Sequence, residues 1–306
     1  MLKLSKADLA SIGNVLYNKA RDIDVAIYNA LLDPSYKDFV LDSLMLYVTK
    51  DGGIGNALHI DNYNPNASVY QTYEALRILA ALQFDKTCEN ELYPQLLNKI
   101  GNYLFNRCLI EDGLWNPLVE SNDQFAHSEE FSYMKNPFST WGVHPTAAIL
   151  GYILELMPPS KAYYKKALKQ INFIFAYLNE EHSWNMYNLT SYSSLLSSLK
   201  RTGLFPKEAK QIEQMILKKA KNHLDDPNFN FPLLLKDIEV DALLKDKINM
   251  KLDEMLSCRA SHGLWEHRKS WKNKKYPEED SAALKWLGAE TVWNLYLLKQ
   301  YGRIEE

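Results

Sequence analysis

The chain has few cysteines, little excess charge and no long apolar run, and each absence narrows its class. Its three cysteines, Cys88, Cys108 and Cys258, are few and odd in number, which argues against a disulfide framework. A net charge of −3 over 306 residues gives no electrostatic basis for nucleic-acid binding. No run reaches the roughly 18 apolar residues of a membrane span, and the first residues lack the apolar core of a signal peptide. We therefore expect a cytoplasmic protein with no nucleic-acid partner and no integral membrane segment.

Common catalytic signatures are also missing. The sequence contains no glycine-rich dinucleotide or phosphate loop, no nucleophile elbow and no His-Glu-x-x-His motif. These absences remove the reaction classes that a short motif can identify, so any chemistry has to come from residues that are far apart in the sequence.

Helical periodicity is the dominant pattern. Leu9, Ile12 and Leu16 begin an apolar stripe at helical spacing, and similar stripes recur along the chain without convincing strand alternation. About eleven helices result, joined by tight turns and by long loops that carry Gly, Trp and His. A hydrophobic fraction of 46% is that of a soluble globular protein, and no Pro/Gly/Ser linker divides the chain. We predict an all-α protein with a single domain over residues 1–306.

A short turn recurs ahead of three of the predicted helices. Asp51-Gly52-Gly53-Ile54-Gly55-Asn56 precedes the helix pattern of residues 67–82, and Asp112-Gly113-Leu114-Trp115 precedes that of residues 146–156. His262-Gly263-Leu264-Trp265 precedes that of residues 282–301. A recurring unit of this kind predicts stacked helical hairpins.

The first turn with Thr72, Ala75, Leu76 and Leu79, together with Trp286-Leu287-Gly288 and Thr291, resembles the prenyltransferase and squalene-cyclase repeat. The resemblance implies a terpenoid cyclase-like α/α toroid, with five to six helical hairpins around an aromatic-lined central cavity. The loops before the inner helices would then border its mouth. The Asp-x-Asp-Asp motif of class II cyclases is absent, and Asp225-Asp226-Pro227-Asn228-Phe229 lacks the final Asp of the class I motif. The resemblance therefore favours a fold more than a reaction.

Three pairs of histidine and carboxylate follow the three turns. His and Glu or Asp together serve general acid–base catalysis, because His titrates near neutrality and a neighbour can shift a carboxylic acid toward it. In a toroid the three pairs would meet at one opening. The alternative is that they only hold their loops by hydrogen bonds. The candidate catalytic residues are His127, Glu129, Glu130, His59, Asp61, Glu266 and His267.

Aromatic residues gather in or beside the same loops. Aromatic faces stabilise carbocations and also stack on sugar rings, so they fit two different substrates. They can equally fill the ends of the inner helices. The candidate substrate-binding residues are Tyr63, Trp115, Trp141, His144, Trp184, Trp265 and Trp271.

Cys258, His262 and His267 are of residue types that bind zinc. Their spacing matches neither the prenyltransferases nor the lanthionine cyclases, and a buried cysteine beside loop histidines is the simpler interpretation. We predict no cofactor, with zinc as the alternative.

Three functions remain open. The first is a cavity enzyme that uses acid–base chemistry on a hydrophobic, isoprenoid-like substrate. The second is a carbohydrate-active enzyme, a hydrolase or lyase on a six-hairpin barrel, with two carboxylates about 5–9.5 Å apart. The third is a non-catalytic binding or scaffold toroid. A dry aromatic cavity favours the first, a polar cavity with paired carboxylates the second, and a filled centre the third.

Overall fold

The computed structural model describes residues 1–178, 185–266, 271 and 276–305. Helices dominate this part of the chain, which confirms the all-α prediction. The described strands are β1 (Ile110–Glu111) and β2 (Leu114–Trp115), which pair antiparallel in the register Ile110 to Trp115 and Glu111 to Leu114. They flank the turn at Gly113 (φ +77°), a left-handed conformation that glycine adopts without strain.

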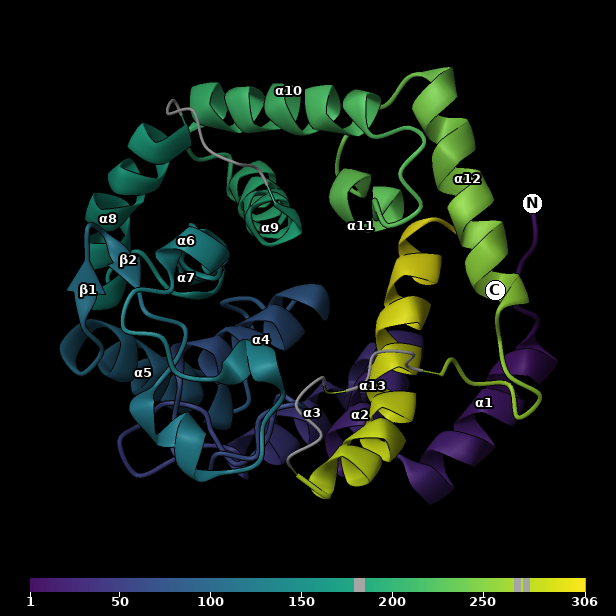
Figure 1. Ribbon diagram of the computed structural model, residues 1–306, viewed down its shortest axis with the longest axis horizontal. Coiled ribbons are helices and arrows are strands. Elements are labelled where there is room, and N and C mark those ends of the chain that lie inside the picture. Colours follow the sequence, from purple (N-terminus) through teal and green to yellow (C-terminus); the bar gives the residue numbers. More distant parts are fainter. Residues whose placement is uncertain (179–184, 267–270, 272–275, 306) are drawn as a thin grey trace.

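Outer and inner helices alternate along the chain (Figure 1). The outer helices are α1 (Lys6–Lys19), α3 (Lys37–Met45), α5 (Leu92–Asn106), α8 (Ala162–Leu178), α10 (Pro206–Asn222) and α12 (Ala242–Ser257). The inner helices are α2 (Asp22–Leu32), α4 (Val69–Ala81), α7 (Thr146–Leu156), α9 (Met186–Thr202), α11 (Phe231–Leu235) and α13 (Glu278–Gln300). The short helices η1 (Pro34–Tyr36), η2 (Glu120–Gln124), η3 (Glu129–Phe131) and α6 (Phe138–Trp141) lie in the connections.

Composition separates the two sets of helices. The inner helix α7 reads Thr-Ala-Ala-Ile-Leu-Gly-Tyr-Ile-Leu-Glu-Leu, and all of its residues except Glu155 are buried. The outer helix α10 carries Lys and Glu on most of its surface and buries only Ala209, Ile212, Ile216 and Ala220. A helix that packs on both sides requires apolar residues all round, whereas a helix with one face to solvent requires a single stripe. The sequence thus assigns α7 to the inside and α10 to the outside.

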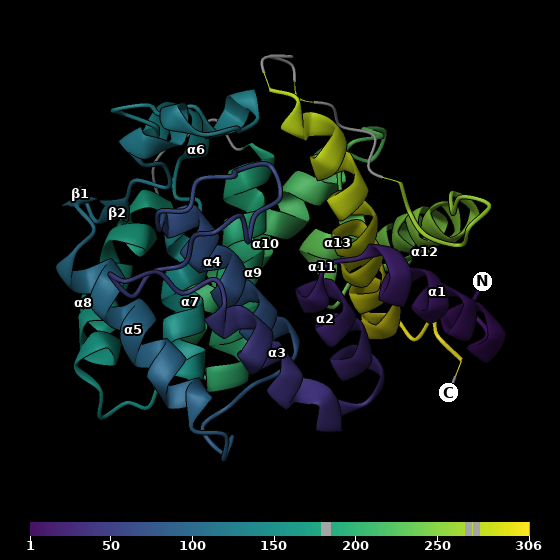
Figure 2. The same cartoon turned by 90° about the horizontal axis from the view of Figure 1, so that it is seen from below.

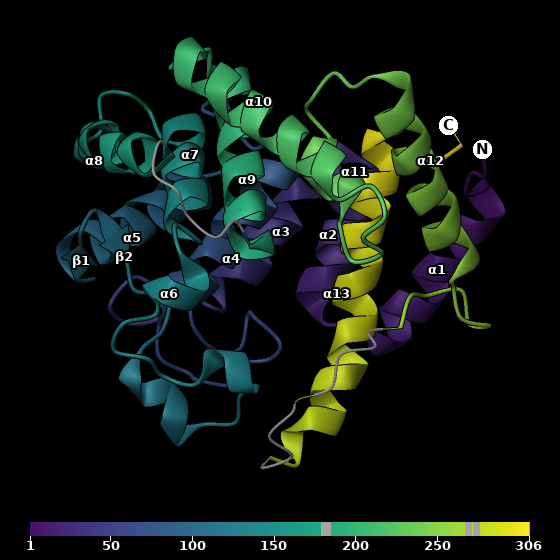
Figure 3. The same ribbon diagram turned by 45° about the horizontal axis from the view of Figure 1, so that its top comes forward.

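The two ends of the chain lie together (Figure 3). Leu4 forms a backbone bridge with Ile304, and α1 and α2 both contact α13. Arg303 is only 2% exposed; its Nη1 donates to the carbonyl of Leu2 at 2.8 Å and lies 2.6 Å from Asp253 Oδ1. A buried arginine needs such partners, because an unpaired buried charge is costly. These contacts join the first and last helices of the chain.

The recurring turns share one structural device. The backbone N–H of Ile54 donates to Thr72 Oγ1 on α4 at 3.1 Å, and that of Trp115 donates to Thr146 Oγ1 on α7 at 3.0 Å. The N–H of Trp265 donates in the same way to Thr291 Oγ1 on α13 at 3.3 Å. Each hydroxyl satisfies a buried turn donor and fixes the turn to the helix that follows. This explains why a Gly turn and a helical Thr recur together in the sequence.

The loops that precede α4, α7 and α13 gather at one end of the helices (Figure 2). We call them the rim loops; they comprise residues 51–67, 110–145 and, in the third loop, 258–266 with Trp271. The first two are joined by a backbone bridge between Asn62 and His127 and by the N–H of Tyr63, which donates to the carbonyl of Ala126 at 2.8 Å. These two rim loops therefore form one connected layer.

Candidate functional site

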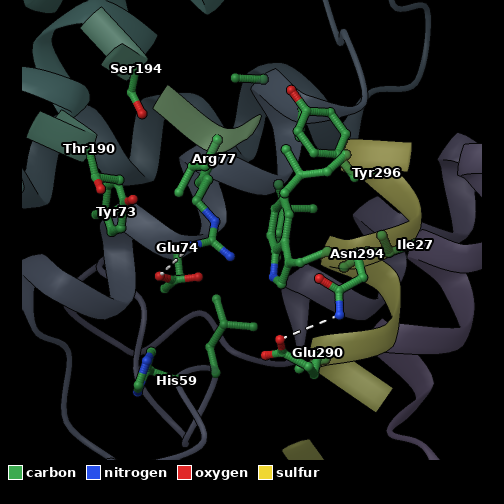
Figure 4. A pocket seen from close by; sticks show the side chains of 18 of the residues that line it. Ile27, His59, Tyr73, Glu74, Arg77, Thr190, Ser194, Glu290, Asn294 and Tyr296 are labelled. Carbon is green, nitrogen blue, oxygen red and sulfur yellow. Dashed lines mark hydrogen bonds and ion pairs between the residues drawn. The ribbon is translucent and has the colours of Figure 1, made fainter. Parts of the chain in front are cut away.

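A cavity of about 370 Å³ lies between the inner helices (Figure 4). That volume falls within the range of about 300–1,000 Å³ found for small-molecule sites. Side chains from α2, α4, α7, α9 and α13 line it, with further residues from the rim loops and from α11 and its two flanking positions. Its polar and aromatic lining includes Arg21, Asp24, His59, Asp61, Tyr70, Tyr73, Glu74, Arg77, Glu130, Tyr152, Thr190, Ser193, Ser194, Ser197, Arg201, Asn230, Lys236, Trp286, Glu290, Trp293, Asn294 and Tyr296.

Glu74 and Arg77 are one helical turn apart on α4 and face the cavity together (Figure 4). Arg77 Nη1 lies 3.4 Å from Glu74 Oε1, and the guanidinium carbon lies 3.7 Å from the ring centroid of Trp293 on α13. Glu74 is 7% exposed. Burial raises the pKa of its carboxyl, and the charges of Arg77 and Arg21 only partly oppose that rise. Glu74 is therefore a carboxyl group whose surroundings favour the protonated form.

Glu290 supplies a second carboxylate from the opposite side, on α13. Its Oε1 accepts a hydrogen bond from Asn294 Nδ2 at 3.4 Å, and both side chains point into the pocket with Glu74 (Figure 4). Two carboxyl groups thus enter one cavity from α4 and α13.

Hydroxyl groups make up much of the remaining lining. Burial raises the pKa of Tyr73 and of Tyr296 to about 12 and that of Tyr70 and Tyr152 well above 10, so all four phenols are neutral at pH 7. Thr190 and Ser194 of α9 face the same cavity (Figure 4), and Ser193 and Ser197 also line it. Neutral hydroxyls both donate and accept, which suits a ligand with many hydroxyls of its own.

Lys236 closes the cavity beside α9. Its Nζ donates to Ser197 Oγ at 2.6 Å and lies 3.0 Å from Asp237 Oδ2, while Ser197 also bonds to Asp237. Burial lowers the pKa of Lys236, although the charge of Asp237 opposes that effect. This group of three is bonded internally and holds the beginning of the α11–α12 connection against α9.

Three of the residues predicted as catalytic line the cavity, namely His59, Asp61 and Glu130. Asp61 is 3% exposed, and its Oδ1 accepts from the indoles of Trp271 at 2.7 Å and Trp286 at 2.8 Å. His59 Nδ1 accepts from the N–H of Asp61 at 3.3 Å, and its ring packs on Phe131. These contacts make Asp61 the acceptor that joins the first rim loop to α13 and to Trp271.

The other predicted catalytic residues do not line the cavity. His127 is buried within its own loop: Nδ1 lies 2.7 Å from the Phe125 carbonyl and Nε2 lies 3.0 Å from Ser132 Oγ. Glu129 and Glu266 are exposed, and Glu266 pairs with His262 at 3.5 Å. His267 lies outside the described residues. The three histidine–carboxylate pairs therefore do not meet as a set within the described part of the cavity.

The predicted aromatic residues are absent from the described lining, and two of them have equivalent structural positions. Trp115 Nε1 donates to the carbonyl of Leu104 at 2.9 Å, and Trp265 Nε1 donates to that of Met255 at 2.7 Å. Each indole of a recurring turn is thus bonded to the end of the preceding outer helix and fills the core. The indoles that line the cavity are those of Trp286 and Trp293.

The remaining aromatic predictions fall in the rim loops. Trp141 and His144 are buried and stack with ring centroids 5.9 Å apart, and burial lowers the pKa of His144 to about 3. The hydroxyl of Tyr63 accepts from Lys285 at 3.2 Å. Trp271 donates to Asp61. Trp184 lies outside the described residues.

Among the residues that the structure describes, no group of three or more His, Cys, Asp or Glu side chains could hold a metal ion. Cys258 is exposed, and His262 is half-buried and paired with Glu266. His267, the third member of the predicted zinc set, lies outside the described residues.

Sequence reasoning missed Glu74, Arg77, Glu290 and Asn294, although a signal for the first two exists. Between residues 67 and 82, Glu74 and Arg77 are the only charged residues in an apolar stretch. Charged side chains are almost never buried without a partner, so two of them one turn apart on a buried helix indicate either an internal ion pair or a polar cavity. Glu290 and Asn294 lie in a more polar segment and carry no comparable signal.

No helix in the described ranges has the length and apolar character needed to cross a lipid bilayer. A comparison with protein-family models finds no match. Comparisons with curated proteins and with solved structures also find none.

Proposed function

We propose that the alternating helix pairs form an α/α toroid and that its central cavity is the active site of a carbohydrate-active enzyme. The observation that carries this proposal is the cavity of about 370 Å³ that contains both Glu74 and Glu290. Glycoside-cleaving enzymes generally use two carboxyl groups, one as acid and one as nucleophile or base. The indole of Trp286 adds a flat apolar face of the kind on which sugar rings stack.

The polar lining weighs against the isoprenoid alternative. An apolar substrate would remove water from Glu74, Arg77 and Glu290 without replacing its hydrogen bonds, at a cost of a few kcal/mol per group. A polyhydroxylated substrate replaces those bonds. The open volume likewise weighs against a scaffold whose centre is filled by side chains.

Glu74 is the proposed general acid. Burial favours its protonated form, so it can donate a proton to the glycosidic oxygen as the bond from that oxygen to the anomeric carbon breaks. Glu290 acts as the second carboxylate in one of two ways. It bonds to the anomeric carbon, and a water that gives its proton to the Glu74 carboxylate then hydrolyses this ester and frees Glu290, or it accepts a proton from a water that attacks the anomeric carbon directly. In either case the leaving sugar departs with the proton of Glu74.

The test is activity on a panel of nitrophenyl glycosides and oligosaccharides. Wild-type protein is expected to release nitrophenol or reducing ends from at least one member. Glu290→Gln should lower that rate by about 10²–10⁴-fold, the usual contribution of one acid–base group. Glu266→Gln is the matched control, because Glu266 is exposed and outside the described lining.

Two results would contradict the proposal. One is equal loss of rate in Glu266→Gln and Glu290→Gln. The other is the absence of cleavage across the panel together with a rise in melting temperature on addition of farnesyl diphosphate, which would support the isoprenoid alternative instead.

A further inference from the structure

Four cations line the described part of the cavity, namely Arg21, Arg77, Arg201 and Lys236. Three of them, Arg21, Arg201 and Lys236, form short hydrogen bonds or ion pairs within the protein. Arg21 bonds to both oxygens of Asp24 at 2.8 and 2.9 Å and to the carbonyl of Leu58 at 2.8 Å. Arg201 bonds to both oxygens of Glu155 at 2.6 and 2.8 Å.

Arg77 differs from these cations in how its donors are used. A guanidinium carries five N–H groups. Its Nη1 lies 3.4 Å from Glu74 Oε1, Tyr73 is a further hydrogen-bond partner, and its Nε is buried without a partner. The two bidentate pairs in the same cavity are shorter by 0.6–0.8 Å (3.4 Å against 2.8 and 2.6 Å). The Glu74–Arg77 contact is therefore longer than the other two pairs, and the Nε donor of Arg77 stays unused.

The guanidinium of Arg77 nevertheless lies against an aromatic ring. It lies over the ring of Trp293, 3.7 Å from the centroid, and it points into the pocket (Figure 4). Its side chain is 29% exposed. Stacking on an aromatic face leaves the N–H edge of the guanidinium free, and that edge matches the two oxygens of a carboxylate or phosphate.

The neighbouring carboxyl group is compatible with a bound anion. Glu74 pairs with Arg77, and burial raises the pKa of Glu74. In its neutral form Glu74 does not repel an anion and can donate a hydrogen bond to it. Arg77 then remains as the local positive charge.

We propose that the ligand of the central cavity carries an acidic group, a carboxylate or a phosphate, and that Arg77 binds this group through the free edge of its guanidinium. The sugar part of the ligand rests on the proposed function, whereas the acidic part rests on Arg77 alone. The substrate class is then a sugar acid or a sugar phosphate.

The test compares ligands that share one ring and differ in charge. Binding of glucuronate, glucose 6-phosphate, glucose and inorganic phosphate is measured by calorimetry on the full chain. One or both sugar anions should bind about tenfold or more tightly than glucose, since charge-assisted hydrogen bonds are roughly twice as strong as neutral ones. The tighter of the two anions identifies the acidic group.

Two variants and one control assign this preference to Arg77. Arg77→Gln should bind the sugar anion no better than glucose. Because that change leaves Glu74 without its cation, the double variant Arg77→Gln with Glu74→Gln removes both charges and should show the same loss. Arg259→Gln is the control, since Arg259 pairs with Asp8 at 3.0 Å and is not part of the described lining.

The possible failures are distinguishable. Equal binding of glucose and both sugar anions by wild-type protein overturns the anion subsite and leaves the carbohydrate proposal standing. A preference for the anion that survives in the double variant overturns the role of Arg77. Binding of phosphate alone, lost in the double variant, supports the subsite and contradicts the carbohydrate proposal. Binding of none of the four probes contradicts both.

Discussion

The rim loops and the inner helices both bring acids and aromatic rings to the central cavity, but they use them differently. In the rim loops the polar groups are bonded to one another: Asp61 accepts two indole N–H groups, and His127 bonds within its own loop. On the inner helices the Nε of Arg77 is buried without a hydrogen-bond partner. Internally satisfied groups stabilise a fold, whereas groups that face a cavity with spare capacity can bind a ligand. We therefore propose that the chemistry lies on α4 and α13 and that the rim loops mainly stabilise the fold.

The largest expected effect is a loss of rate when Glu74 on the inner helix α4 is replaced. Glu74→Gln is expected to lower the rate on a substrate found with the glycoside panel by about 10²–10⁴-fold, because the amide cannot donate the acidic proton. In wild-type protein the rate should fall as pH rises through the raised pKa of Glu74. In the variant the residual rate should no longer fall over that pH range, as measured by pH–rate profiles. If the variant kept the wild-type profile, a residue other than Glu74 would be the general acid.

The next effect concerns His144, buried beneath the rim. Burial lowers its pKa to about 3, below the ordinary value of 6.5, so the unfolded state binds a proton that the folded state excludes. The stabilising contribution of neutral His144 is complete above pH 6.5 and is lost as pH falls toward 3, at about 1.4 kcal/mol per unit of pKa difference. Urea unfolding of wild type and His144→Phe at pH 7, 5.5 and 4 measures this loss. The variant should show a smaller decline, and parallel declines would refute this origin.

Asp61 tests the structural role of the rim directly. Asp61→Ala should lower the free energy of unfolding by roughly 2–4 kcal/mol, because the Trp271 and Trp286 indoles lose a buried acceptor. Asp61→Asn retains an acceptor oxygen and should lose less, as measured by chemical denaturation. If Asp61→Ala were as stable as wild type but inactive, Asp61 would belong with the catalytic residues.

The smallest expected effect separates two neighbours in one rim loop. His127→Ala should cost about 1–3 kcal/mol of stability, since it removes the partner of the Ser132 hydroxyl and of the Phe125 carbonyl. Glu129→Ala should change stability by no more than about 0.5 kcal/mol, because Glu129 is exposed. Thermal unfolding and the rate assay together check both variants. If His127→Ala were fully stable but had no turnover, His127 would be a catalytic residue of the rim loops.

The recurring turns show how far a local pattern reaches. In the sequence a turn with Gly and an aliphatic or aromatic residue precedes each of three helices, and the structure joins turn and helix by backbone N–H groups that donate to Thr72, Thr146 and Thr291. The same pattern suggested Trp115 and Trp265 as ligand-binding residues, yet both indoles bond to the preceding outer helix. Residues recur in such a repeat because packing requires them at each turn, and Trp115 and Trp265 accordingly fill the core.

The site was harder to predict because its parts come from separate helices. Glu74 and Arg77 are visible as two charges in an apolar stretch, but nothing in the sequence pairs them with Trp293 or Glu290 more than 200 positions later. His127 and Glu129 are prominent in the sequence as a neighbouring histidine and carboxylate. In the structure His127 bonds to Phe125 and Ser132 of its own loop, and Glu129 is exposed. The residues that face a shared space were the less conspicuous ones.

The sequence by itself determined that this chain is helical and which helices are covered on both sides, because apolar periodicity and capping act within a few residues. The tertiary structure alone decided which polar side chains face the cavity. That outcome depends on how α4, α9 and α13 rotate and pack against their neighbours, and such packing is set by the whole chain at once.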